Sequence, residues 1–580
     1  MSPNMQQSNQ TPAQYLSSRM REAFERTFPD AAPFPDLTVS IATRPEFGDY
    51  QCNYAMALAK KLGRPPRQTA DQVIANARME DIAHPLEVAG PGFINIRLRD
   101  EWCLETATLI ASTPNLGVPR CGAGRTVVLD YSSPNVAKPM HIGHIRSTII
   151  GNALDRLHRF LGYNVISDNH LGDWGTQFGI LIMGYRHFLD REALESDPVG
   201  ELERVYVKSY ARCEEDPAWL DQCRLELVKL QEGHPDNLEL WRKFVKVSLE
   251  EFQRIYERLG VKFDLVRGES HYHAMLPDVI ERLAREGLAR ESEGALVVFL
   301  DDEKLPPCIV RKSDGAFNYA ATDIATVISR VNEFKPDRII YVTDERQQLH
   351  FKQVFAICRK LGLKTDLEHV WFGLMRLPEG TFSTRQGNVI KLEKLLDEAE
   401  ARALAIVKEN SPDMPPERQR QIAKAVGIGA VKYADLSQNP QTTVVFTWEK
   451  ALSLEGNSGP YLQYAYARIA SVRDKYAERF QRTDPESFPI RITEPVERAL
   501  VMELLRFPDS VMNAAHQYKP SILADYLYEL SQTYSAFYQN VPFLKAEEGI
   551  RESRVRLCGM VAAVLGKGLN LLGIETPERI

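Results

Sequence analysis

The chain has 580 residues, too many for one hydrophobic core, which predicts about three or four domains. Hydrophobic residues make up 44% and charged residues 26%, as in ordinary soluble globular proteins, and no apolar run is long enough to span a membrane. The net charge is −7, from 71 basic and 78 acidic residues, so composition alone argues against nucleic-acid binding. Any RNA must therefore meet local basic or aromatic patches.

The first residues are polar and lack the apolar core of a secretory signal. Eight cysteines are scattered along the chain, and none forms a Cys-x-x-Cys pair. We therefore expect free thiols in a reducing cytoplasm, with no disulfide framework and no tightly bound protein metal.

Residues 1–112 predict a small α/β domain. Residues 14–28 and 53–62 have helical spacing, and residues 38–41 form a short strand pattern. A Gly-Pro-Gly turn at 90–92 precedes a second strand pattern at 93–98.

Residues 113–415 predict a Rossmann-like parallel-sheet domain. A buried strand at 125–131, a loop, a helix at 142–161 and a strand at 164–167 form a βαβ unit of an open parallel sheet. We expect further strands of this pattern at 296–300, 338–342 and 370–372. Residues 190–260 are charge-rich and helical, so they predict a helical insertion.

Residues 416–580 predict an all-α helix bundle. Helical periods occur at 417–433, 462–480, 497–518, 522–538 and 551–572, and no strand is needed. Pro508 is expected to kink or split the third of these helices.

The motif His141-Ile142-Gly143-His144 lies where the first strand of the βαβ unit leads into its helix. Open parallel sheets bind ligands beyond the carboxyl ends of their strands, and a helix N-terminus there attracts phosphate. Gly143 allows close approach, and the two histidines share one helical face. Taken alone, the motif is also compatible with two surface histidines that cap a turn.

The surrounding sequence resembles the arginine-specific members of the class I aminoacyl-tRNA synthetases. The string from Ser133 to Thr148 and the string Gly-Asp-Trp-Gly-Thr-Gln-Phe-Gly at 172–179 carry this resemblance. Residues 46–53, 88–93, 455–464 and 571–580 extend it over essentially the whole chain. The resemblance implies ATP-dependent attachment of L-arginine to its tRNA through arginyl-adenylate, with release of AMP and pyrophosphate. It also implies Mg²⁺ bound to the ATP, a monomer, and a requirement for tRNA before the amino acid is activated.

The second class I motif, usually Lys-Met-Ser-Lys-Ser, corresponds to residues 381–388 and lacks both lysines; relatives commonly have lysine where Gln386 stands. A cation is still needed for the phosphates, and Lys138 and Arg385 are the two candidates. The resemblance implies His141, His144, Lys138 and Arg385 as catalytic residues. It implies ATP contacts from Ser133, Pro134, His141, Gly143, His144, Phe382 and Ser383.

A pocket for arginine needs carboxylates and neutral acceptors, because a guanidinium has five donors and no acceptor. Tyr319 and Asp323 are four residues apart and share a face if the segment is helical. By resemblance, Asn135 holds the substrate backbone, Tyr319 and Asp323 meet its side chain, and Gln347 contributes at one end. The full predicted set is Asp130, Ser132, Asn135, His144, Tyr319, Asp323 and Gln347. From the residues alone, a surface Asp323 and a core Tyr319 remain an alternative.

The tRNA is expected to contact both ends of the chain. The C-terminal bundle resembles an anticodon-binding domain, and aromatic and polar residues near its start suit splayed bases. The N-terminal Phe93 and Asn95 share a strand face and match positions that read a tRNA loop base in relatives. The predicted tRNA-binding residues are Phe93, Asn95, Tyr461, Gln463, Tyr464 and Arg468. Packing of these side chains within their own domains is the alternative.

Two other functions remain open from the sequence. A neighbouring class I synthetase is one, although a cysteine-specific enzyme should carry a zinc-ligating cysteine set, and none is evident. A non-catalytic RNA-binding paralogue is the other, but it should have lost His141, His144 or Asp323, and all three remain. We therefore expect tRNA(Arg), L-arginine and ATP as partners.

Overall fold

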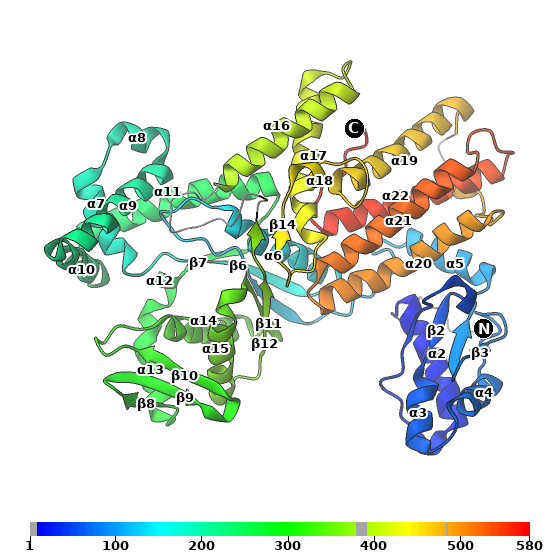
Figure 1. The fold of residues 1–580 in the computed structure, drawn as a ribbon, viewed down its shortest axis with the longest axis horizontal. Coiled ribbons are helices and arrows are strands. Elements are labelled where there is room, and N and C mark those ends of the chain that lie inside the picture. The colour runs from blue at the N-terminus through cyan, green and yellow to red at the C-terminus, as the bar shows by residue number, and fades with distance from the viewer. Residues whose placement is uncertain (1–8, 377, 379–390, 483–484) are drawn as a thin grey trace. The chain divides into compact units, whose positions relative to one another are not determined.

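The structure, a computed structural model, describes residues 9–376, 378, 391–482 and 485–580. The chain divides into two compact units (Figure 1). Unit 1 comprises residues 1–121, 461–570 and 576–580, and unit 2 comprises residues 122–460 and 571–575. The predicted boundaries at 112/113 and 415/416 remain predictions.

Unit 1 combines an antiparallel sheet with helices from both ends of the chain. The sheet order is β1 (Val39–Ile41), β2 (Tyr50–Cys52), β4 (Phe93–Ile96), β3 (Glu87–Ala89). Its helices are α2 (Pro12–Thr27), α3 (Tyr54–Leu62), α4 (Pro66–Asn76), α5 (Asp100–Ser112), α19 (Gly459–Phe480), α20 (Pro495–His516), α21 (Pro520–Asn540) and α22 (Ile550–Leu571). The first two residues of α19 and the last residue of α22 belong to unit 2. Helix α20 continues through Pro508, so this proline does not split it.

Unit 2 is built on a five-stranded parallel sheet, as predicted. The order is β12 (Asp366–Phe372), β11 (Arg338–Asp344), β5 (Thr126–Asp130), β6 (Asn164–Leu171), β7 (Leu265–Gly268). The sequence order reverses between β5 and β11, and such a switch point is where an open α/β sheet binds its ligand. The central strand β5 is buried on both faces, which explains its continuous apolar run.

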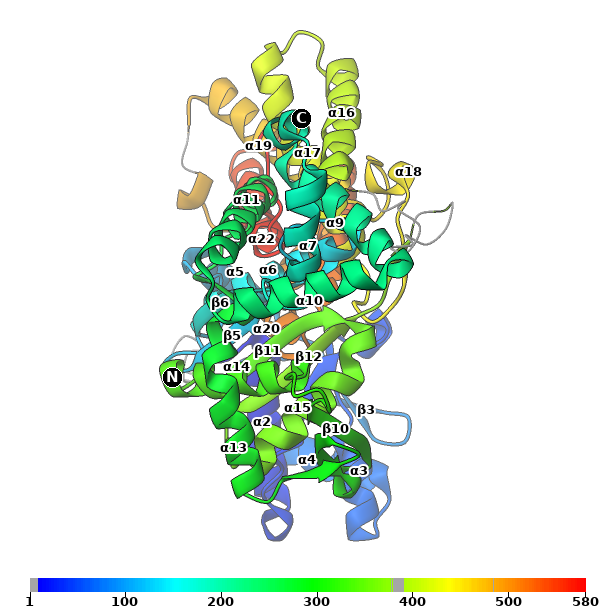
Figure 2. The same ribbon diagram turned by 90° about the vertical axis from the view of Figure 1, so that its left-hand side faces the viewer.

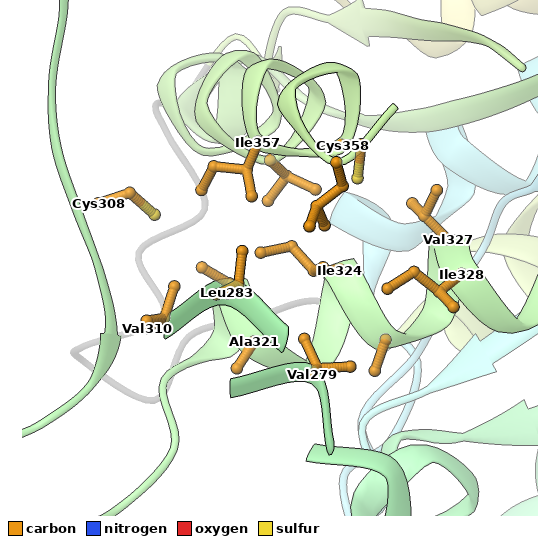
Figure 3. Packing of buried hydrophobic residues seen from close by; sticks show 14 of the residues in the cluster. Val279, Leu283, Cys308, Val310, Ala321, Ile324, Val327, Ile328, Ile357 and Cys358 are labelled. Atoms are coloured by element: carbon orange, nitrogen blue, oxygen red, sulfur yellow. The ribbon is translucent and has the colours of Figure 1, made fainter. Parts of the chain in front are cut away.

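Helices separate the strands and cover the sheet. They are α6 (Ile142–Phe160), α12 (Glu269–Tyr272), α13 (Leu276–Arg285), α14 (Tyr319–Phe334) and α15 (Gln348–Lys360). Figure 3 shows the apolar side of α14, with Ala321, Ile324 and Val327, packed among residues of α13 and α15. The core thereby fixes the rotation of α14 about its axis.

The predicted insertion at residues 190–260 contains α8 (Arg191–Ser196), α9 (Pro198–Glu215), α10 (Pro217–Gln231) and α11 (Pro235–Leu259). Helix α7 (Gln177–Phe188), which precedes the predicted range, packs against α9 and α10, and the five helices are grouped together in Figures 1 and 2. Asp197 and Asp216 cap the starts of α9 and α10, and each is followed by proline at the first helical position. This Asp-Pro pair supplies the capping acceptor and the preset backbone angle that start a helix.

The strand at 296–300 was predicted to belong to the parallel sheet, and this prediction was wrong. The strand predicted at 296–300 exists as β9 (Ala295–Leu300), but it lies between β8 (Ala289–Ser292) and β10 (Leu305–Arg311) in a separate antiparallel sheet. Its neighbours are joined by short turns, which favour antiparallel pairing over the crossover that a parallel strand needs.

The last part of unit 2 follows the undescribed segment. It contains α16 (Leu392–Asn410), α17 (Pro416–Leu436), α18 (Trp448–Ala451) and the short strand β14 (Val444–Val445). Strand β14 pairs in parallel with β13 (Met375–Arg376), which precedes the undescribed segment. Helix α17 packs against α16 and α6.

Candidate functional site

A cavity of about 930 Å³ opens at the carboxyl ends of β5, β6 and β11, at the switch point of the sheet. All seven predicted arginine-binding residues line it, namely Asp130, Ser132, Asn135, His144, Tyr319, Asp323 and Gln347. Four of the predicted ATP-binding residues also line it: Ser133, His141, Gly143 and His144, the last of which is in both sets. Pro134 and Lys138 belong to the same loop but not to the cavity lining. The structure thus brings together predicted residues from three distant segments, 130–144, 319–323 and residue 347.

The loop between β5 and α6 has a strained backbone. Ser132, Ser133 and Ala137 have φ angles of 75°, 50° and 61°, in the left-handed region that non-glycine residues rarely adopt. Side-chain oxygens accept hydrogen bonds from the three backbone N–H groups: Ser147 Oγ at 2.9 Å, Asn169 Oδ1 at 3.1 Å and Ser248 Oγ at 2.8 Å, respectively. The Ser132 hydroxyl also lies 2.8 Å from Thr148 Oγ1 and 2.8 Å from the Tyr256 hydroxyl. The surrounding helices and sheet therefore hold the loop in this shape.

The two histidines of the motif cap the start of α6. His141 Nδ1 accepts from the N–H of Gly143 at 3.0 Å, and His144 Nδ1 accepts from the N–H of His141 at 3.1 Å. Burial, with help from Lys138 and Arg346, lowers the pKa of His141; burial and then His141 lower that of His144 to about 3. Both rings are therefore neutral near pH 7, and since each Nδ1 accepts, each Nε2 carries a proton that can be donated.

Gly143 is required by the packing of these rings. A Cβ atom at this position would lie 2.7 Å from His141 Cε1 and 2.8 Å from His141 Nδ1. Any larger residue must therefore displace the ring that caps the helix.

Asp130 does not face the cavity as an unpaired carboxylate. The buried Arg330 guanidinium donates to Asp130 Oδ2 at 2.7 Å and to Asp168 Oδ2 at 2.9 Å, while Ser133 Oγ donates to Asp130 Oδ1 at 3.0 Å. Both carboxylate oxygens thus accept hydrogen bonds that tie the loop to the sheet, and the predicted contact of Asp130 with arginine remains a prediction. The partner Arg330 lies 200 residues away, so the sequence offered no signal for the pairing.

Glu269 is a cavity residue that our sequence reasoning missed. It is the first residue of α12, directly after β7, and burial followed by the charges of Asp323 and Asp173 raises its pKa to about 8. Asp323 accepts a hydrogen bond from His350 Nε2 at 2.5 Å. Glu269 and Asp323 thus form a carboxylate pair that suits a cationic ligand. A signal existed, since an acid directly after a parallel strand lies at the ligand-binding edge.

The cations near the cavity differ in their partners. The Lys138 ammonium lies 5.1 Å from the centre of the Tyr206 ring on α9, which favours a cation–π contact. Arg346, which sequence reasoning also missed, lines the cavity and pairs with Asp344 at 2.6 Å. Phe382, Ser383 and Arg385, predicted in the second motif, lie outside the described residues.

The predicted tRNA-binding residues of unit 1 occupy different environments. Asn95 is buried and accepts a hydrogen bond from Gln51 Nε2 at 2.8 Å, whereas Phe93 is half-buried. Gln463 is fully buried, so direct contact with a base would require the bundle to rearrange. These assignments remain predictions.

An exposed aromatic group surrounds Arg468. Its guanidinium lies 4.8 Å from the ring centre of Tyr464 on α19 and 5.2 Å from that of Tyr538 on α21. Tyr461 packs edge-on against Tyr528. Tyr538 was missed by sequence reasoning because the other helix supplies it.

Within the described ranges, no group of three or more His, Cys, Asp or Glu side chains is arranged to hold a metal ion. The same residues contain no helix that is both long and apolar enough to cross a membrane.

Family models match three successive parts of the chain. Residues 14–98 match the arginyl tRNA synthetase N terminal domain, residues 107–448 match the catalytic domain of class I (R) tRNA synthetases, and residues 462–580 match the DALR anticodon binding domain.

Curated relatives match nearly full length. The arginine–tRNA ligase of Fusobacterium nucleatum is 46% identical over 96% of this chain and 98% of its own length. That of Laribacter hongkongensis is 45% identical over 95% and 96%, respectively.

Solved structures agree with this likeness. The Plasmodium falciparum arginyl-tRNA synthetase has a TM-score of 0.83 at 28% identity, with 98% of this chain and 99% of that chain covered. The Thermus thermophilus arginyl-tRNA synthetase has a TM-score of 0.82 at 26% identity, with 98% and 100% covered. With the histidine pair and the acidic cavity at the switch point of its sheet, the chain belongs to the arginyl-tRNA synthetases, a family of class I aminoacyl-tRNA synthetases.

Proposed function

We propose that this protein attaches L-arginine to tRNA(Arg) at the expense of ATP, through arginyl-adenylate, and releases AMP and pyrophosphate. The observation that carries the proposal is one cavity with neutral histidine donors at a helix N-terminus on one side and a carboxylate pair on the other. The first side suits phosphate and the second suits a guanidinium.

The arginine side chain is proposed to lie between Glu269 and Asp323, with Tyr319 beside them. Two carboxylates accept from the planar fork of a guanidinium, a geometry that a lysine ammonium does not match. Asn135 and Gln347 are proposed to hold the other end of the substrate. Asp130 and Ser132 support the loop from behind.

The ATP phosphates are proposed to accept from the Nε2–H groups of His141 and His144, with Mg²⁺ entering as part of the ATP substrate. In-line attack by the arginine carboxylate on the α-phosphate then needs positioning and charge stabilisation only. Lys138 and Arg385 remain the proposed cations for the leaving pyrophosphate, and Arg346 is added to them because it lines the cavity.

Measuring arginine activation in Lys138→Ala tests the first of these cations. We expect a large fall in rate because the family's loop lysines are absent from residues 381–388. A rate near that of the unmodified protein would exclude Lys138 from this role.

The tRNA is proposed to stack anticodon bases on the Tyr464–Arg468–Tyr538 group and to meet unit 1 again at Phe93. We further propose that the protein is a cytoplasmic monomer. Light scattering at working concentration tests the oligomeric state, and a stable dimer would contradict it.

Pyrophosphate exchange with each of the twenty amino acids, with and without tRNA, tests the function as a whole. We expect exchange with arginine alone, and only when tRNA is present. Exchange with another amino acid would indicate a neighbouring class I specificity, and no exchange under any condition would indicate a non-catalytic paralogue.

A further inference from the structure

The motif at residues 172–179 has no role in the chemistry proposed above, yet its first two residues contact the segments that carry Asn135 and Glu269. Gly172 lies beside the segment that carries Asn135. Its N–H donates to the Pro134 carbonyl at 3.2 Å, and its carbonyl accepts from the Val136 N–H at 3.1 Å. These two bonds enclose Asn135 from both sides in the sequence.

Gly172 also leaves room for the Asn135 side chain. A Cβ atom on Gly172 would lie 2.1 Å from Asn135 Oδ1, far inside van der Waals contact. The Asn135 amide therefore lies directly over Gly172, and this contact sets its position in the cavity.

The next residue, Asp173, holds the opposite end of the site. Its Oδ1 accepts from the N–H of Ser270 at 2.9 Å, and its Oδ2 accepts from the Ser270 hydroxyl at 2.6 Å. Ser270 directly follows Glu269 in the single turn of α12. Because both oxygens already accept hydrogen bonds and only 4% of Asp173 is exposed, this carboxylate is not available to the substrate.

Two further contacts fix Asp173 itself. Trp241 Nε1 donates to its backbone carbonyl at 2.8 Å. A Cβ atom on Gly268 would lie 2.1 to 2.2 Å from its carboxylate, so the chain before Glu269 passes close to Asp173 only because residue 268 is glycine. Asp173 therefore contacts Gly268 and Ser270, the residues on either side of Glu269.

We propose that Gly172 and Asp173 set the distance between Asn135 and Glu269 and thereby select arginine by its length. The inference rests on the proposed function, in which Asn135 holds the backbone end of arginine and Glu269 the guanidinium end. Gly172 and Asp173 are joined by one planar peptide bond, so their Cα atoms stay about 3.8 Å apart. They are positioning residues, since each acts on the substrate through its neighbour.

The prediction is a change in length selectivity. The unmodified protein should prefer arginine over homoarginine, which is one methylene longer, and over 2-amino-4-guanidinobutyrate, which is one methylene shorter. A one-methylene mismatch in a fitted site typically changes kcat/KM by about 10- to 200-fold. Loss of the contact between Asp173 and Ser270 should lower kcat/KM for arginine and bring the kcat/KM values for arginine and the two analogues closer together.

Ser270→Ala is the decisive variant, because it removes the hydroxyl bond to Asp173 and leaves the backbone bond in place. Asp173→Asn is the stronger variant; should it fail to fold, Ser270→Ala decides alone. Ser167→Ala is a matched control, since the Ser167 N–H and hydroxyl donate to Asp264 Oδ2 at 2.8 Å and 2.9 Å, and neither residue lines the cavity.

Aminoacylation by the full-length protein with tRNA(Arg) is measured for the three amino acids, together with the KM for ATP. We expect Ser270→Ala to lower the preference for arginine over both analogues at least fivefold, with the KM for ATP within twofold, and Ser167→Ala to change neither. An unchanged preference, or an equal loss for all three amino acids and ATP, would overturn the inference. The assay of the unmodified protein distinguishes failure of this inference from failure of the proposed function, because in the second case the unmodified protein would not attach arginine to tRNA(Arg).

Discussion

The carboxylate pair makes arginine binding depend on pH. With a pKa of about 8 in the ligand-free site, Glu269 is ionised in about one molecule in eleven at pH 7 and in about ten of eleven at pH 9. If the guanidinium binds the ionised form, the apparent affinity for arginine rises about tenfold between pH 7 and pH 9, or about 1.4 kcal/mol. Below pH 7 it falls about tenfold for each pH unit.

The KM for arginine in aminoacylation, measured from pH 6 to 9 with saturating ATP and tRNA, checks this prediction. Glu269→Gln is the control, because it mimics the protonated acid at every pH. Titration of the arginine α-amino group affects both proteins equally, so the KM of Glu269→Gln divided by the KM of the unmodified protein reports on Glu269 alone. We expect this ratio to be largest at pH 9 and to decrease towards pH 6.

Two further measurements follow from the same proton. Calorimetric titration with arginine in two buffers of different ionisation enthalpy should show release of about 0.9 proton at pH 7. The stability of the ligand-free protein depends on pH in the opposite direction from its affinity for arginine. The raised pKa of Glu269 contributes to the free energy of unfolding at low pH, and this contribution is lost as pH rises through about 8. Glu269→Gln should therefore raise Tm at pH 8.5 but not at pH 4. Identical pH profiles for the two proteins, with no proton release, would refute the reasoning.

Three other substitutions test the remaining parts of the molecule. Gly143→Ala should lower kcat at least tenfold, about 1.4 kcal/mol, with little change in Tm, because its Cβ displaces the His141 ring; an unchanged kcat would contradict the capping role. Arg330→Met should lower the free energy of unfolding, measured in urea, by about 3–5 kcal/mol, because it leaves two buried carboxylates unpaired. Removing the exposed Arg338 is the control and should cost less than about 1 kcal/mol. Equal effects of the two changes would argue against the buried pairing. Tyr538→Ala should raise the KM for tRNA about 5- to 100-fold while Tyr538→Phe does not, as expected for stacking, and a raised KM for ATP instead would point to misfolding.

The local parts of the site were predictable because they are contiguous in the chain. The strand, loop, helix and strand at residues 125–167 follow one another, so apolar periodicity and the histidine motif locate the phosphate side directly. The four-residue spacing of Tyr319 and Asp323 predicted a shared helical face, but their assignment to the site rested on the resemblance, since the residues alone left a core Tyr319 and a surface Asp323 open.

The missing parts depend on strand order and on pairing across the sheet. The role of Glu269 appears only once β7 is known to lie beside β6, and the short α12 has too few residues to show a period. The ion pair of Asp130 with Arg330 depends on a helix that follows the insertion and the second sheet. The pairing of Asp130 with Arg330 leaves no trace in local composition, whereas Glu269 could be found only from its place directly after a strand.

The hydrogen bonds that hold the loop between β5 and α6 have a consequence for the synthesis of the protein. Ser248, which accepts the hydrogen bond of the strained Ala137, is synthesised 111 residues later. At about 5–20 residues per second, a ribosome needs about 6–22 s to cover that interval. During this time the emerging chain carries the nucleotide-binding motif without the partner that holds its loop in shape. A fragment that ends before α11 would lack this hydrogen-bond acceptor permanently.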